Sequence, residues 1–328
     1  QKVQHNRKAV SENISAKASA YFEKALSSQQ ALMFEQAAAG WENYINMYTG
    51  FPGFESAQYN LALCLFQLGR FKEAIEPLRI LTKSSSFPKL GYDARLLLGE
   101  TYLATGEKDL ALITTFDIMP DLQMEKEMGL KRSSKALGVA SKKWGEPDYI
   151  QKIRLYTLRG RLFNERGQDH EAALAFGRAR SMLDGASKTL LSQADRVSLQ
   201  GQLSWREIEA LSARCARLVV PPEQLSEAEF LAYVDQHYRC ASPAQSHFCE
   251  VAQTKDAQLV SQTVVAYREL VEHPLFLAKK LPPPARRIKT QEQKKVYELE
   301  MRTLIQNTVN ERAAGFKHLE KCGLEQIF

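Results

Sequence analysis

The chain has 328 residues, of which 44% are hydrophobic and 25% are charged, and its formal net charge at pH 7 is +6. This composition excludes a disordered, collagen-like or disulfide-dense chain and is typical of a folded domain or a repeat array. No apolar run approaches the roughly 18 residues that a membrane-spanning helix needs, so the sequence predicts no transmembrane segment.

Apolar residues recur at intervals of three and four between breaks that contain proline. Strict alternation of apolar and polar residues, the pattern of a half-buried strand, is not sustained over five or more residues. The sequence therefore predicts an all-α chain.

The first residue is Gln1, and polar and charged residues follow it. Such a start is typical of an exported protein whose signal peptide has been removed. We therefore expect a periplasmic or otherwise exported protein of the bacterial cell envelope. A cytoplasmic protein is the alternative.

One pattern of small and large residues repeats along the first half of the chain. It reads small, large, Gly, Ala, and its second copy lies 37 residues after the first. A third copy has the same internal spacing but lies out of phase with the other two. The copies are Ala62, Leu65, Gly69, Ala74 and Leu78, then Gly99, Tyr102, Gly106 and Ala111, then Gly160, Phe163, Gly167, Ala172 and Phe176.

These segments resemble tetratricopeptide repeats, helix pairs of about 34 residues in which helix A meets helix B at small residues. The resemblance covers about residues 15–185 and implies an all-α solenoid of helical hairpins with a glycine at each turn. This chain departs from the family pattern in three places. Leu32 replaces the turn glycine of the first unit, Pro77 should perturb its helix, and Thr115 is polar where a large apolar residue is usual.

The resemblance also implies a binding surface, because stacked A helices form the concave groove of such solenoids. The expected occupant is an extended or helical segment of a partner protein. The residues at the inward-facing positions are Ser56, Tyr59, Leu63, Phe66, Asp93, Leu96, Glu100, Leu103, Arg154, Thr157, Arg161 and Asn164.

We expect residues 1–185 to form the repeat region, with an irregular insert at about 121–147. Residues 186–328 are predicted to form a helical C-terminal region, which includes one helix from about 244 to 271.

His237, Cys240, His247 and Cys249 are the one cluster of ligand-type residues in the sequence. Their spacing matches no standard zinc motif, so a metal-dependent enzyme is the weakest alternative and no cofactor is expected. In an exported protein the preferred interpretation is a Cys240–Cys249 disulfide. Cys215 and Cys322 have no evident partner, and we expect Cys64 to be buried.

Basic residues concentrate in a proline-rich connector at 279–295, and their excess equals that of the whole chain. A second hypothesis is therefore a cytoplasmic adaptor whose connector docks on nucleic acid or an anionic membrane. No aromatic residues interleave these charges, which argues against single-stranded nucleic acid. The basic residues are Lys279, Lys280, Arg286, Arg287, Lys289, Lys294 and Lys295.

No phosphate-binding loop, nucleophile elbow or zinc-protease motif occurs in the sequence. The preferred function is therefore a non-catalytic scaffold or adaptor that binds a segment of a partner protein. Self-association is left open.

Overall fold

The computed structural model describes residues 2–84, 86–119, 145–218 and 227–278, and isolated residues between 290 and 322. Within these residues every regular element is a helix, which confirms the all-α prediction. The chain divides into two compact units, residues 1–162 and 163–328. The boundary predicted from the sequence lies later, after residue 185. None of the helices in the described part of the chain combines the length and the apolar character needed to cross a membrane.

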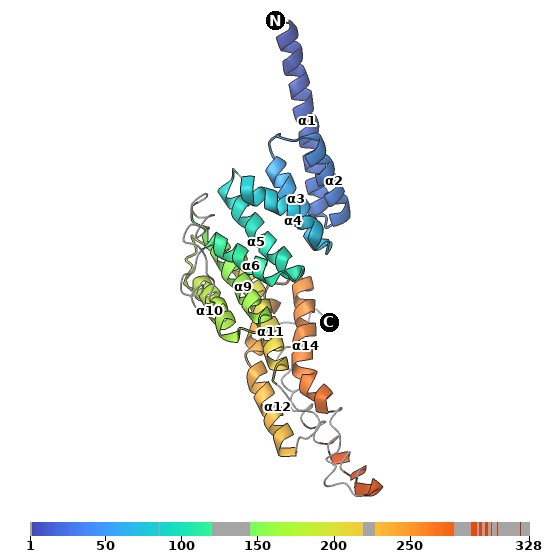
Figure 1. Ribbon diagram of the computed structural model, residues 1–328, viewed down its shortest axis with the longest axis vertical. Coiled ribbons are helices and arrows are strands. Elements are labelled where there is room, and N and C mark those ends of the chain that lie inside the picture. Colours follow the sequence, from blue (N-terminus) through green and yellow to red (C-terminus); the bar gives the residue numbers. More distant parts are fainter. Residues whose placement is uncertain are drawn as a thin grey trace. The chain divides into compact units, whose positions relative to one another are not determined.

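The first unit is a succession of antiparallel helical hairpins, and each helix packs against the next from α1 to α6 (Figure 1). This arrangement confirms the solenoid that the repeat pattern predicts. The predicted insert at 121–147 lies outside the described residues up to Trp144. The helices are α1 (Lys2–Gln30), α2 (Phe34–Met47), α3 (Phe54–Gln67), α4 (Phe71–Ser84), α5 (Pro88–Ala104), α6 (Lys108–Ile118) and α9 (Tyr149–Glu165), whose last turn belongs to the second unit.

The turns inside the hairpins share one geometry. Gly69, Gly106 and Gly167 adopt left-handed φ values of 73°, 83° and 71°, and the residue after each glycine donates its N–H to the carbonyl five positions back. Leu32 adopts the same conformation with φ 59°, and Met33 donates to the Ser28 carbonyl at 3.0 Å. The first hairpin is therefore regular although it lacks the turn glycine.

The small residues of the repeat pattern lie where helices approach each other. Ala62 and Ala74 are completely buried. A Cβ added to Gly99 would lie 3.0 Å from Leu158 Cδ2 and 3.7 Å from the Ala111 carbonyl oxygen. The pattern thus marks the contacts between helices A and B, as in the family.

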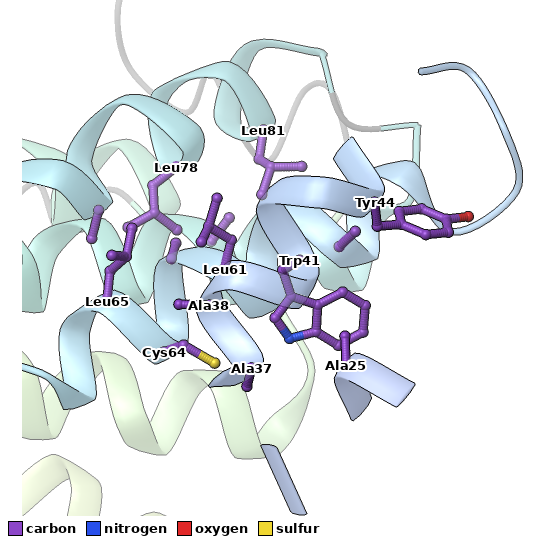
Figure 2. Close-up of a cluster of buried hydrophobic side chains, with 14 of the residues drawn as sticks. Ala25, Ala37, Ala38, Trp41, Tyr44, Leu61, Cys64, Leu65, Leu78 and Leu81 are labelled. Atoms are coloured by element: carbon purple, nitrogen blue, oxygen red, sulfur yellow. The ribbon is translucent and has the colours of Figure 1, made fainter. Parts of the chain in front are cut away.

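The core of the first hairpins is built around Trp41, whose side chain is completely buried (Figure 2). Its indole N–H donates to Gln29 Oε1 at 2.8 Å, and its ring meets the Phe22 ring edge to face at 4.8 Å. Cys64 lies in the same cluster with no exposed surface, which confirms the prediction that it is buried.

Pro77 does not interrupt α4, which continues from Phe71 to Ser84. Proline lacks the N–H that would bond the carbonyl four residues earlier, that of Glu73. Glu73 is exposed, so water can solvate this carbonyl and the helix tolerates the proline.

The polar side chain of Thr115 contacts a buried arginine, Arg159. The Arg159 side chain is completely buried, and its Nη2 donates to the carbonyls of Thr115, at 3.0 Å, and of Met119. Its Nε donates to Thr115 Oγ1 at 3.4 Å, and its guanidinium carbon lies 4.3 Å from the centre of the Phe116 ring. Arg159 thereby caps the C-terminal end of α6 from inside the unit.

The second unit contains α10 (Asp169–Gly185), α11 (Gln193–Ala216), α12 (Glu227–Ala241), α13 (Ala244–Ala252) and α14 (Ala257–Ala278). The long α11 is its central element, because α10, α12, α13 and α14 all pack against it. Residues 244–271 were predicted to form one helix, but the chain breaks between α13 and α14 at Lys255, which has φ 56°. A Cβ on Gly201 of α11 would lie 2.1 Å from Thr254 Cγ2, so glycine permits this close approach.

Candidate protein-interaction surface

Three A helices of the first unit, α3, α5 and α9, contribute to one electrostatic cluster. The pKa of Tyr59 on α3 is raised to about 12, chiefly by burial and also by the carboxylate of Asp93 on α5, while Arg154 on α9 opposes both effects. Burial also raises the pKa of Asp93, against the hydrogen bond from Gln151 and the charge of Arg154. The structure therefore brings together three residues that the repeat pattern had placed in one groove.

Gln151 and Arg161 hold α9 against α5. The Gln151 amide donates to Asp93 Oδ1 and to the Lys89 carbonyl, each at 3.1 Å. Further along the helices, Arg161 forms an ion pair with Glu100, and these two side chains are 20% and 30% exposed. α9 therefore lies against α5, and charged groups on it stay accessible.

The other predicted groove residues fall into two groups, those that are partly exposed and those that are almost fully buried. Leu63 and Phe66 are half-buried and pack against the core, and the Thr157 hydroxyl donates to the Ile153 carbonyl at 2.9 Å. Leu96 and Asn164 are only 7% exposed, so they offer a partner almost no surface, and Asn164 belongs to the second unit. We define the helix A face as the remaining residues: Ser56, Tyr59, Leu63, Phe66, Asp93, Glu100, Leu103, Arg154, Thr157 and Arg161.

The cysteine pairing differs from the prediction. Cys240 is bonded to Cys215 with a Cα–Cα distance of 5.9 Å, and Cys249 is bonded to Cys322. The predicted Cys240–Cys249 bond is therefore wrong. Cys240 lies in the last turn of α12 and meets α11, which carries Cys215, whereas Cys249 lies on a different helix, α13. The positions of Cys215 and Cys322 in the sequence gave no sign of these partners.

The two histidines near these cysteines do not form a metal site with them. His237 is buried and its Nε2 lies 2.8 Å from the Leu270 carbonyl oxygen, while His247 lies beside Arg180. Within the described ranges, no group of three or more His, Cys, Asp or Glu side chains is placed to hold a metal ion.

Arg180 is the centre of a polar network in the second unit. Its Nη1 bonds both carboxylate oxygens of Glu250 at 3.1 and 3.0 Å, and its Nη2 donates to Glu207 and to Ser204 Oγ. Burial alone would raise the pKa of Glu250, but hydrogen bonds from His247 and Ser204 and the charge of Arg180 lower it to about 2. Spacing in the sequence could not reveal this network, since its members come from α10, α11 and α13.

Of the seven basic residues of the connector, Lys295 alone lies among the described residues, and it is exposed. The docking role predicted for it therefore stays a prediction.

Residues 56–85 match the family model described as Tetratricopeptide repeat. The match covers the hairpin of α3 and α4, which carries Tyr59 and the turn at Gly69. A comparison with curated proteins found no match. Tetratricopeptide repeats serve as protein-interaction scaffolds through the surfaces that their stacked helices create. The chain thus contains a tetratricopeptide-repeat segment at residues 56–85, within a solenoid of similar hairpins.

Proposed function

We propose that this protein is a non-catalytic adaptor that holds a segment of a partner protein against the helix A face of its first unit. The observation that carries the proposal is the convergence of Tyr59, Asp93 and Arg154 from three A helices, α3, α5 and α9. Residues from three helices on one surface suit an extended or helical segment that crosses several repeats.

The charges of the helix A face support recognition of a polar segment. Asp93 and Glu100 lie on α5, and Arg154 and Arg161 lie on α9. A partner segment along these helices would therefore meet a row of carboxylates beside a row of guanidinium groups. Such complementary charges fix the orientation of a partner more than they raise its affinity.

We further propose that the protein works in the bacterial cell envelope. Disulfides persist in oxidising compartments such as the periplasm and are rare in the cytosol. The Cys215–Cys240 and Cys249–Cys322 bonds of the second unit support this location.

Photo-crosslinking in the native host tests the proposed surface. A photoreactive amino acid replaces Arg154, which is exposed on the helix A face, or Lys72, which is exposed on the B helix α4. We expect position 154 to capture a defined partner protein and position 72 to capture none. Equal capture of the same partner from both positions would place the binding surface elsewhere.

A further inference from the structure

A separate pocket opens on the first hairpin, between α1, the end of α2 and the loop that leads to α3. Its volume is about 210 Å³, and three aromatic rings line it, those of Phe22, Tyr44 and Phe51. Ser15, Ser19 and Glu23 of α1 also line it. The lining thus combines aromatic rings with one carboxylate, and this combination favours a positively charged ligand.

The wall of this pocket is held in place by its own contacts. The Tyr44 hydroxyl, which Figure 2 shows at the outer end of the ring, away from the aliphatic cluster, donates to the Pro52 carbonyl at 2.7 Å. Gly53 adopts φ 91°, and a Cβ there would lie 3.0 Å from Phe22 Cε2. Glycine thus lets the loop lie directly on the Phe22 ring. The pocket is therefore formed before any ligand arrives.

The rings in the wall of the pocket belong to one connected aromatic cluster. The centres of the Phe22 and Tyr44 rings lie 5.4 Å apart, in an edge-to-face arrangement. The Tyr48 ring lies between those of Tyr44 and Phe51, with centre-to-centre distances of 5.4 Å and 5.7 Å. The face of an aromatic ring is electronegative, so several rings around one space attract a cation.

Glu23 supplies a full negative charge at the same place. Its side chain is exposed and makes no hydrogen bond or ion pair with any residue that the structure describes. The pocket therefore combines aromatic rings with a carboxylate that no described residue pairs, and both favour a positively charged ligand.

We propose that this pocket binds a basic side chain, arginine or lysine, of the partner segment. Its volume of about 210 Å³ is large enough for one such side chain, with the alkyl stem against the rings and the charged head near Glu23. Phe22 lies 37 residues before Tyr59, so the pocket occupies the position on the first hairpin that Tyr59 occupies on the helix A face. In this respect the inference rests on the proposed function and adds the chemistry of the partner.

An NMR titration of the full chain, with labelled aromatic side chains, tests the proposal. The probes are N-acetylarginine amide and N-acetylcitrulline amide, which have nearly the same shape but differ in charge, at constant ionic strength. We expect saturable shifts of the Phe22, Tyr44 and Phe51 signals with the arginine probe. The citrulline probe should bind at least about tenfold more weakly, since it loses the cation–π and carboxylate attractions.

Matched variants locate the effect. Glu23→Gln, which removes the charge, and Phe51→Leu, which keeps apolar volume but removes a ring face, should each weaken arginine binding about tenfold. Glu42→Gln removes an equal, exposed charge from α2 outside the pocket and should leave binding unchanged. Thermal unfolding of each variant confirms that it is folded.

Equal binding of the arginine and citrulline probes, or no shift of these rings, would overturn the proposal. Binding of tetramethylammonium but not of the arginine probe would also overturn it and would indicate a small quaternary ammonium ligand. Because the arginine probe needs no partner protein, its failure to bind would overturn the pocket proposal but not the proposed role of the helix A face. Failure to crosslink at position 154 would contradict the proposed partner surface, whereas binding of the arginine probe would still show that the pocket accepts a basic group.

Discussion

Leu32 and Gly69 lie 37 residues apart and adopt the same left-handed backbone conformation, with φ values of 59° and 73°, at the turns of successive hairpins. Glycine adopts this conformation without strain, but a residue with a Cβ is destabilised there by roughly 1–2 kcal/mol. The first turn therefore keeps the geometry of the repeat at a cost in stability.

Leu32→Gly should stabilise the protein by about 0.5–1 kcal/mol. This value is the backbone strain relieved in the folded state minus the larger conformational entropy that glycine gives the unfolded chain. Leu32 is 73% exposed, so little packing is lost. Urea unfolding of the two proteins measures the difference. The reverse change at an equivalent turn, Gly69→Leu, should be destabilising. A loss of stability in Leu32→Gly would show that the leucine side chain matters more than the strain.

Arg159→Met should destabilise the first unit by about 2–3 kcal/mol, because it leaves the Thr115 and Met119 carbonyls without their charged donor. Arg154→Met on the same helix is the control, and its side chain is exposed. Chemical unfolding should therefore separate the two variants clearly. Equal, small effects would show that Arg159 does not hold the end of α6.

The cysteines should differ sharply in reactivity. Burial raises the pKa of Cys64 to about 11, so almost no thiolate exists at pH 8 and the native protein should not react with iodoacetamide. After unfolding without reductant, mass spectrometry should find one alkylated cysteine, and after reduction five, the number in the sequence. Five labels without reductant, in protein isolated from the native host, would contradict the disulfides and the envelope location.

The Glu250 network should make stability depend on acidity. Because the folded-state pKa of Glu250 lies at about 2 and its ordinary value is 4.5, its contribution is complete above pH 4.5 and is lost as the pH falls toward 2. A shift of this size corresponds to about 3 kcal/mol. The stability difference between wild type and Glu250→Gln should therefore shrink in acid. Glu272→Gln, which changes a more exposed carboxylate of the same unit, is the matched control.

The repeat architecture could be predicted because its signals are local. Gly69 and Gly106 mark turns, and Ala62, Ala74 and Gly99 mark close helix contacts, and each acts within its own hairpin or the next. The same spacing predicted that Tyr59, Asp93 and Arg154 share a face. Only the residues from α9 required a further step, because the insert shifts their phase.

What could not be predicted depends on contacts between distant segments. Cys240 pairs with Cys215 because α12 lies against α11, and no spacing rule reveals that packing. An arginine such as Arg159 is expected at the surface from its residue type alone. It is buried here because α9 packs against α6. Leu32 could be recognised as a departure from the pattern, but its left-handed conformation follows from the hairpin that the surrounding helices impose.

The central claim is that the helix A face contacts the partner, and a charge swap tests it most directly. Glu100→Arg combined with Arg161→Glu keeps the ion pair between α5 and α9 but reverses the charges that a partner meets. For the protein captured from position 154, calorimetry should show binding at least about tenfold weaker with unchanged thermal stability. The same swap of the exposed pair Arg70 and Glu73 should leave affinity unchanged. If the double variant at Glu100 and Arg161 binds the partner with wild-type affinity, the claim is contradicted.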